Sequence, residues 1–390
     1  MHTFLSYSLL MTYLDHITAS PIDPRVLQIM QAYLHEHYGS PVSLHRYGQQ
    51  ARQALVHARK QIAQLIHAKT EEIIFTASGT ESDNLAIKGL AQAYSKKGRH
   101  LVISAVEHQA VLYAVRHLER QGYSVTEVPV DYDGLVHPAK VRQAMRDDTI
   151  LVSITLASDE VGVIQPIEEI AQMVHEQEAI MHTDAVSAVG RMPVDVKTLG
   201  VDALSLSARS LNGPAGSAAL FLKQGIRLRP QIEGGIQEEG RRSGHENLPA
   251  IVGFGTAAAL TQSEMSARMV HLKRLEEQLL NGLKNRIPAI SLNGHATHRL
   301  PGHLNLMIQD ADSESMVLML DAKNIAVSIG STCASHASKT SHVLQAMGRT
   351  PRAAQSSLMI TMGPSTPESD IERMIEVLPD VVAQLRHVAG

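Results

Sequence analysis

The stretch SLSARSLNGPAGSAALF, residues 205–221, decides how this sequence is interpreted. Its alternating apolar residues predict a strand that ends in small polar residues, and a Gly-Pro turn leads into a second apolar run. Polar groups placed just after a buried strand are typical of a ligand site in a parallel sheet. Ser210 occupies the centre of this loop, so the chemistry of a hydroxyl group sets what such a site can do.

Composition indicates an ordinary globular protein. The chain has 390 residues, of which 44% are hydrophobic and 19% are charged. The formal net charge of -4 gives no basic footprint, which argues against nucleic acid as a partner. The single cysteine, Cys333, excludes an internal disulfide and fits a reducing compartment.

The N-terminus does not resemble a secretory signal. MHTFLSYSLLMTYLD contains no Lys or Arg and no convincing cleavage site, and Met1 and Met11 are both candidate starts. No stretch approaches the ~20 consecutive apolar residues that a membrane-spanning helix needs. We therefore expect a cytoplasmic protein without a membrane partner.

Helical and strand patterns alternate along the chain. Three- and four-residue apolar spacing predicts helices over 24–39, 51–68 and 108–122, and short apolar runs predict strands over 71–78, 100–107, 149–158 and 178–187. This alternation predicts an α/β fold with a mostly parallel sheet covered on both faces. From about residue 262, a long charged amphipathic helix indicates the beginning of a second, smaller α/β unit.

Polar residues follow several of the predicted strands. They are Gly79-Thr80, His108, Ser158-Asp159, Asp184, and the pair Ser207 and Arg209. The Gly-Thr turn also opens a predicted helix, which leaves free backbone N–H groups for an anion. Because parallel strands end at one edge of a sheet, these positions predict one shared site.

Six segments resemble, in order, the signatures of the cysteine desulfurases, which belong to the class V aminotransferase family of pyridoxal-phosphate (PLP) enzymes. They are FTASGTESDNLAIKG, SAVEHQAVLYAV, HTDAVSAVG, SLSARSLNGPAGSAALF, GGIQEEGRRSGHENLPAIVGFG and SIGSTCASHAS. The match runs in register from about Thr12 to the C-terminal helix. Its coverage of nearly the whole chain makes the resemblance specific.

The resemblance implies the PLP-dependent transferase fold type I. A large domain, residues 25–261, would hold a mostly parallel seven-stranded sheet, and the smaller α/β domain would comprise residues 262–390, joined by the N-terminal segment 1–24. The family acts as a dimer. Its reaction removes sulfur from cysteine and leaves alanine and an enzyme persulfide.

Part of the family's site is retained. By resemblance, Asp184 holds the pyridinium nitrogen of PLP and His108 stacks on its ring. Gly79, Thr80 and Ser207 match phosphate-binding positions. Cys333 falls on the sulfur-accepting cysteine, and the same thiol is a candidate iron–sulfur ligand; no other metal ligand is expected.

Other positions depart from the family's pattern. Ser210 replaces the Schiff-base lysine, and a hydroxyl can neither bond to PLP as that amine does nor move the substrate's α-proton as a base. Ser187 replaces a glutamine, and Ser158 and Ser40 each replace an asparagine. Pro364 aligns with the arginine that binds the substrate carboxylate, with no evident substitute nearby.

Two replacements favour an anion site. Arg209 stands where the family has a phosphate-contacting histidine, and His245 stands where a threonine reaches the phosphate from the partner subunit. Plainer explanations stay open: a structural carboxylate for Asp184, a packed histidine for His108, a salt bridge from Arg209 or His245 to a group such as Glu246. A lone cysteine is usually a small core residue.

Three functions follow from this pattern. The preferred one is a pseudoenzyme, a dimeric scaffold or sulfur and iron–sulfur relay through Cys333 that binds PLP without a covalent link or not at all. The partner would be a second copy, a paralogue or an iron–sulfur scaffold protein. The alternatives are an active PLP-dependent cysteine desulfurase that uses an unusual amine, and a phosphate- or anion-binding module.

Overall fold

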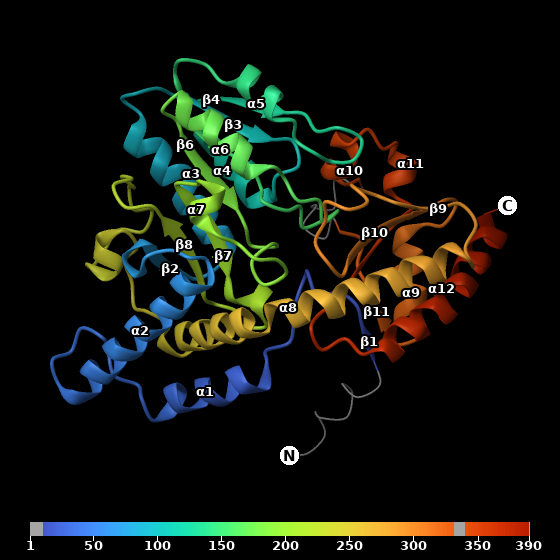
Figure 1. Cartoon of the computed structure of the whole chain (residues 1–390), viewed down its shortest axis with the longest axis horizontal. Helices are drawn as coiled ribbons and strands as arrows, with labels where there is room; N and C mark the ends of the chain where they lie inside the picture. The colour runs from blue at the N-terminus through green and yellow to red at the C-terminus, as the bar shows by residue number, and fades with distance from the viewer. Residues whose placement is uncertain (1–10, 331–339, 390) are drawn as a thin grey trace.

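A seven-stranded sheet forms the centre of the larger part of the molecule (Figure 1). This computed structural model describes residues 11–330 and 340–389. In spatial order the strands are β2 (Ile73–Thr76), β8 (Ala218–Leu222), β7 (Ala203–Ser207), β6 (Ile180–Asp184), β5 (Thr149–Ser153), β3 (His100–Ser104) and β4 (Ser124–Val128). Only β8 runs antiparallel to its neighbours in this sheet. The predicted mostly parallel sheet is confirmed.

Helices cover both faces of this sheet. On one face, α3 (Gly79–Tyr94) and α4 (Gln109–Glu119) form a core with Ile74 and Ile103. On the other face, α2 (Arg46–Leu65), α6 (Ile167–Glu176) and the first half of α8 (Leu248–Lys284) enclose Phe75 and Val102. Neighbouring residues of one strand therefore point into different cores, as the two-residue period of a strand requires.

A smaller unit lies beside the large sheet. Its strand β10 (His303–Ile308) pairs antiparallel with β12 (Ser357–Thr361) and β9 (Ile290–Leu292). The N-terminal strand β1 (Thr12–Tyr13) pairs with β11 (Ile325–Ala326), so the two ends of the chain contribute to one unit. Helices α9 (Ser313–Asp321) and α12 (Glu368–Ala389) pack against each other there.

Of the remaining elements, only α1 is longer than two helical turns. They are α1 (Pro24–His35), α5 (Pro138–Ala144), α7 (Val196–Leu199), α10 (His342–Ala346), α11 (Pro351–Ala354), and the 3-10 turns η1 (Thr70–Glu72), η2 (Ala208–Leu211) and η3 (Gln237–Gly240).

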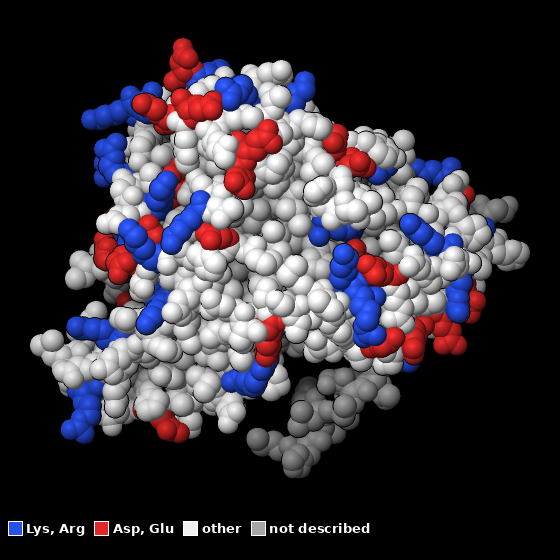
Figure 2. Space-filling view, viewed as in Figure 1, with Lys and Arg blue, Asp and Glu red and all other residues white. Residues whose placement is uncertain are grey.

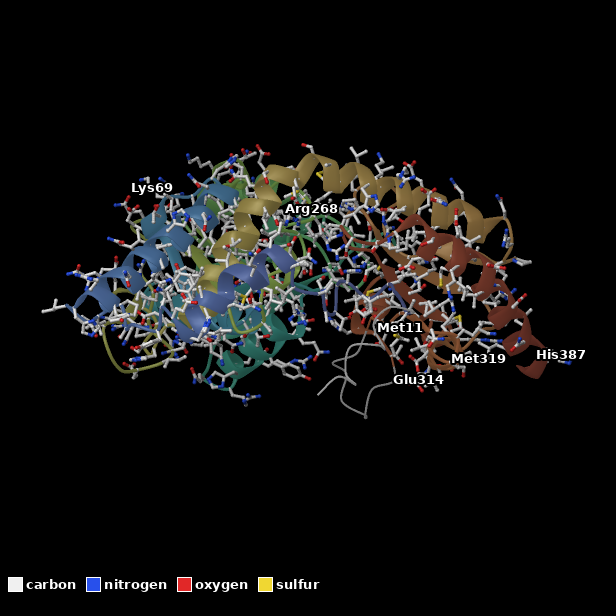
Figure 3. The ribbon with its side chains drawn as sticks, turned by 90° about the horizontal axis from the view of Figure 1, so that it is seen from below. Met11, Lys69, Arg268, Glu314, Met319 and His387 are labelled. Carbon is white, nitrogen blue, oxygen red and sulfur yellow. The ribbon has the colours of Figure 1, made fainter. Side chains whose placement is uncertain are left out.

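The helix α8 joins the two units (Figure 3, where Arg268 marks its middle). Residues from Leu248 to Ala258 pack in the core of the large sheet, whereas Leu272, Leu275 and Leu279 pack in the core of the smaller unit. The helix begins at Leu248 and not near residue 262, where the charge pattern placed it. A domain boundary between 261 and 262 therefore falls inside one continuous helix.

The surface carries mixed charges. Figure 2 shows Lys and Arg interspersed with Asp and Glu over the face in view, in keeping with 35 basic and 39 acidic residues. Over the two described stretches of the chain, no helix combines the length and the apolar composition that crossing a membrane requires.

Leu275→Ala tests the role of α8. We expect this change to lower the free energy of unfolding by about 3 kcal/mol, because Leu275 is fully buried and its loss leaves a cavity. Val270→Ala on the same helix is the matched control, since Val270 is 71% exposed, and should change stability by less than about 0.5 kcal/mol. Urea unfolding measures both; equal losses would contradict the assigned packing.

Candidate functional site

A cavity of about 410 Å³ opens at the carboxyl ends of the parallel strands. Residues after β2, β3, β5, β6 and β7 line it, and the segment after β1 adds His16 and Ile17 from the smaller unit. Its size is in the ordinary range for small-molecule sites. Most of the residues that the sequence placed at the strand ends therefore line one cavity, as the strand-end rule predicts.

The N-terminus of α3 forms one wall of the cavity. Ser78 caps the helix by accepting a hydrogen bond from the Glu81 N–H at 3.1 Å. Gly79 and Thr80 line the cavity, and the first N–H groups of a helix have no intrahelical partner, so this end favours an anion. A side chain at Gly79 would clash, since its Cβ would lie 2.7 Å from the Val186 side chain.

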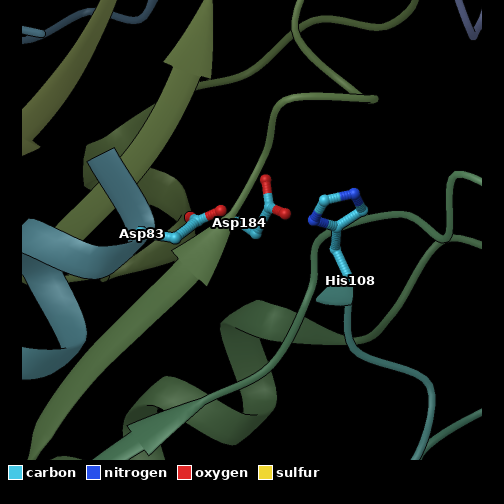
Figure 4. A group of neighbouring side chains, drawn as sticks. All are labelled: Asp83, His108 and Asp184. Atoms are coloured by element: carbon cyan, nitrogen blue, oxygen red, sulfur yellow. The ribbon is translucent and has the colours of Figure 1, made fainter. Parts of the chain in front are cut away.

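Acidic and imidazole groups meet at the end of β6. Asp184 is buried, and its Oδ1 accepts a hydrogen bond from the Val186 N–H at 2.9 Å. One ligand-type atom from each of Asp83, His108 and Asp184 lies within 4.8 Å of the other two (Figure 4). His108 caps α4 through a hydrogen bond that Nδ1 accepts from the Ala110 N–H.

Burial dominates the electrostatics of the carboxyl groups beside the cavity. Desolvation raises the pKa of Asp184, although the nearby His108 opposes the rise. Desolvation and the charge of Asp184 raise the pKa of Asp83 well above its ordinary value. Desolvation also raises the pKa of Glu107 to about 8, against hydrogen bonds from the Ser104 hydroxyl and the Thr155 N–H. The cavity floor therefore favours neutral carboxyl groups or a bound cation.

The loop after β7, which contains Ser210, forms another part of the cavity lining. Ser207, Arg209 and Ser210 all line the cavity. Ser210 lies in η2, is half-buried, and donates a hydrogen bond from Oγ to the Ser207 carbonyl at 2.8 Å. Arg209 is exposed and also borders a second hollow near Asp159. The side chain at the predicted lysine position thus faces the cavity as a hydroxyl.

The structure does not bring every predicted site residue together. Ser187 lines the cavity, but Ser158 does not: it is buried in a turn, where its Oγ accepts hydrogen bonds from the Glu160 and Val161 N–H groups. The exposed His245 borders a different hollow, near Gly244.

Two further candidates lie outside the cavity lining, and a third cannot be placed relative to it. Ser40 and Pro364 are not among the lining residues, and Cys333 lies outside the described residues.

Three ionisable residues of the lining were missed from the sequence. Asp83 lies one helical turn after Gly79, a spacing that could have indicated a shared face. His16 and Arg191 also line the cavity, but both depend on contacts between the two units. Nothing local in the sequence marks them.

Comparisons with known proteins agree with this architecture. The aminotransferase class-V family model matches residues 12–374. The "Cysteine desulfurase IscS" of Methanosarcina thermophila is 42% identical over 97% of this chain and 93% of its own length, and the "Cysteine desulfurase IscS 1" of Archaeoglobus fulgidus is 41% identical over 97% and 99%.

Solved structures give the same result. A "NIFS-like protein" has a TM-score of 0.90 at 31% identity over 96% of this chain and 100% of its own. A NifS-like protein from Rickettsia africae has a TM-score of 0.87 at 32% identity, over 96% and 99%. The fold is that of the fold type I class of PLP-dependent proteins. The chain belongs to the class V aminotransferase family, as a homologue of the IscS and NifS cysteine desulfurases.

PLP, the cofactor that this family implies, fits the cavity in part. The helix end at Gly79 and Thr80 suits its phosphate, and the buried Asp184, beside an Asp83 Oδ1 that has no hydrogen-bond partner among the described residues, suits a protonated ring nitrogen. The covalent link does not fit, since no lysine is present among the described lining residues. These residues favour a non-covalent ligand.

Glu107→Gln tests the buried carboxyl groups. The folded state holds the Glu107 proton up to about pH 8, whereas the ordinary pKa is 4.5. The stabilisation that comes from the protonated Glu107 is therefore complete below about pH 4.5 and is lost as the pH rises through 8. In wild type, this group lowers the free energy of unfolding by up to about 1.4 kcal/mol per pH unit between pH 6.5 and 8. Glu107→Gln should remove that part of the slope, because an amide does not titrate in this range. The fold should persist, because the amide oxygen can accept the same two hydrogen bonds.

Urea unfolding across this pH range measures the slope. Glu127→Gln, at an exposed position, is the control and should leave the slope unchanged. Identical slopes in wild type and Glu107→Gln would contradict the raised pKa.

Proposed function

We propose that this protein is a cysteine desulfurase-like pseudoenzyme that binds PLP, or a similar phosphate ester, without a covalent bond. One observation carries the proposal: Ser210 faces the cavity at the family's lysine position, and the described lining residues offer no other primary amine. Bound PLP would supply an electron sink, but the chain then lacks the amine that anchors it and transfers the α-proton.

The residues that remain serve binding. Asp184, with Asp83 behind it, would hold a proton on a heteroaromatic nitrogen, and His108 would contact the ring. Gly79, Thr80 and Ser207 would receive the phosphate, with Arg209 supplying a positive charge at the cavity. Each group orients or neutralises a ligand, and none provides a nucleophilic nitrogen.

An active cysteine desulfurase is the second candidate. The 42% identity to a cysteine desulfurase and the retained Asp184 and His108 favour it. It would require a displaced lysine or an externally supplied amine in place of Ser210. A simple phosphate- or anion-binding module is the third candidate, and the α3 N-terminus favours it.

Ser210→Lys tests the proposal. Wild type mixed with PLP and then reduced with borohydride should show no stoichiometric PLP adduct on any single lysine, whereas Ser210→Lys should show a stoichiometric adduct on the lysine introduced at this position, by peptide mass spectrometry. Ser210→Ala is the matched control and should behave like wild type. A stoichiometric adduct in wild type would instead favour the active enzyme.

A dimer or other partner complex is part of the proposal. Around α1 and the start of α2, large hydrophobic side chains are exposed: Leu34 63%, Tyr38 71%, Leu44 85% and Tyr47 50%. Exposed apolar groups in one region are typical of a protein interface. We propose that a second copy or a paralogue covers this region in the cytoplasm, and that its His245 reaches this chain's cavity.

The relay is proposed from the position of Cys333 in the family motif. Its thiol would accept the outer sulfur of a persulfide on a donor protein, which is left as a thiol, and would pass that sulfur to a thiol of an iron–sulfur scaffold protein. Alternatively, Cys333 would act as an iron–sulfur ligand.

Leu44→Glu tests the interface. We expect the purified wild type to elute at twice the chain's 42.4 kDa mass and Leu44→Glu to shift toward the monomer, because the added charge would be buried in the interface. Light scattering coupled to gel filtration gives the mass. Lys60→Glu, a charge change at an exposed, polar position of α2, is the control. A monomeric wild type would contradict the proposed pairing.

A further inference from the structure

One arginine at the cavity is buried without a counter-charge. Arg191 follows Gly190 in the turn after β6, lines the cavity, and is only 6% exposed. Its Nη1 donates a hydrogen bond to the Met362 carbonyl at 3.2 Å, while its Nε has no hydrogen-bond partner among the described residues. A guanidinium has five N–H donors, and one hydrogen bond from Arg191 to the described residues uses one of them.

Two other buried arginines show how this chain normally compensates such a charge. Arg268 and Arg299 are each 7% exposed. The Arg268 Nη2 lies 2.8 Å from a Glu264 oxygen, and the Arg299 Nε lies 3.4 Å from a Glu276 oxygen. Within the described part of the chain, Arg191 has no carboxylate within 4.0 Å. Arg191 is thus as deeply buried as Arg268 and Arg299, but it lacks the carboxylate partner that each of them has.

The neighbours of Arg191 do not supply the missing negative charge. Burial and the charge of Arg191 lower the pKa of His16 to about 4, and burial, Arg191 and Arg299 lower that of His303 to about 3. Both imidazoles are therefore neutral near pH 7. Burial lowers the pKa of Arg191 only to about 10, so its guanidinium stays protonated there. A buried, unpaired charge is costly, and an anionic ligand would offset that cost.

We infer that Arg191 binds the carboxylate, or another small oxyanion, of a ligand at the side of the cavity that faces the smaller unit. The planar fork of a guanidinium matches two oxygens of one anion, and desolvation strengthens the pairing. Arg191 contacts Met362 of the smaller unit, whereas Gly79 and Thr80 lie at the N-terminus of α3, and all three residues line one cavity. A ligand with two anionic groups would therefore suit this cavity.

The position of Arg191 also bears on Pro364. Arg191 donates to Met362, two residues before Pro364, where the family resemblance expects a carboxylate-binding arginine. Arg191, in the turn after β6, therefore places a guanidinium beside the segment that contains Met362 and Pro364. The inference concerns the cavity of the proposed function but does not depend on PLP binding or on Ser210.

Arg191→Met and Arg299→Met, both made in the full chain, separate a binding role from a structural one. Without added anions, Arg191→Met should melt at or above the wild-type temperature, because it removes an uncompensated charge. Arg299→Met should melt lower, because it leaves Glu276 unpaired.

The second measurement adds L-alanine, acetate or sulfate to PLP-free protein at constant ionic strength. The wild-type Tm should rise with increasing anion, as linkage requires for a ligand of the folded state, and calorimetry should give a matching Kd. Arg191→Met should lose the response to L-alanine and acetate, and Arg191→Lys should retain part of it. Sulfate bound at the helix end of Gly79 and Thr80 would persist, so the sulfate response is taken as the difference between wild type and Arg191→Met. A rise with L-alanine and acetate alone assigns a carboxylate ligand, and a rise with sulfate alone assigns an inorganic or phosphoryl oxyanion.

Two results would overturn the inference. One is a wild-type Tm that none of the three anions raises. The other is a set of anion responses that all persist unchanged in Arg191→Met. Because PLP is absent throughout, neither result depends on whether the proposed PLP binding is correct.

Discussion

The cavity is organised by buried ionisable groups that have no opposite charge to pair with among the described residues. Asp83 and Asp184 lie close together in its lining, and Arg191 lines it with no carboxylate within ion-pair distance in the described part of the chain. Burial favours the neutral form of each carboxyl group, whereas Arg191 remains charged. Such an arrangement costs stability, and a ligand with a cationic ring and anionic substituents would recover it. The charges and the burial of the lining residues therefore indicate which ligand would fit the cavity, and they do not indicate a reaction.

At the family's lysine position, Ser210 offers a hydroxyl in place of an amine. Its Oγ donates a hydrogen bond to the Ser207 carbonyl within the 3-10 turn η2. Lining residues at the ends of β2, β3, β6 and β7 surround it. In the proposed function these residues bind a ligand, and the absence of the amine removes the family's catalysis.

Much of this could be predicted from the sequence, because it depends on local periodicity. Alternating strand and helix patterns indicated the parallel sheet, and the strand-end rule predicted one shared site for Asp184, His108 and Ser207, which all line one cavity. Contacts between distant segments could not be predicted. Arg191 donates to Met362, which is 171 residues away, and lies close to His16 near the start of the chain. Ser158 was predicted at the site, but its Oγ instead accepts a hydrogen bond from the Glu160 N–H in its own turn. The extent of α8 was also missed, because its apolar first half resembles part of the large domain's core while its second half is charged.

Sulfide release from L-cysteine tests the central claim most directly. The purified full-length protein would be incubated with PLP and L-cysteine, and sulfide and alanine would be quantified against PLP alone, since free PLP itself reacts slowly with amino acids. The account predicts that both products stay at the level of PLP alone, because the cavity holds a ligand without an amine to act on it. Stoichiometric alanine and sulfide formed over repeated turnovers would contradict it.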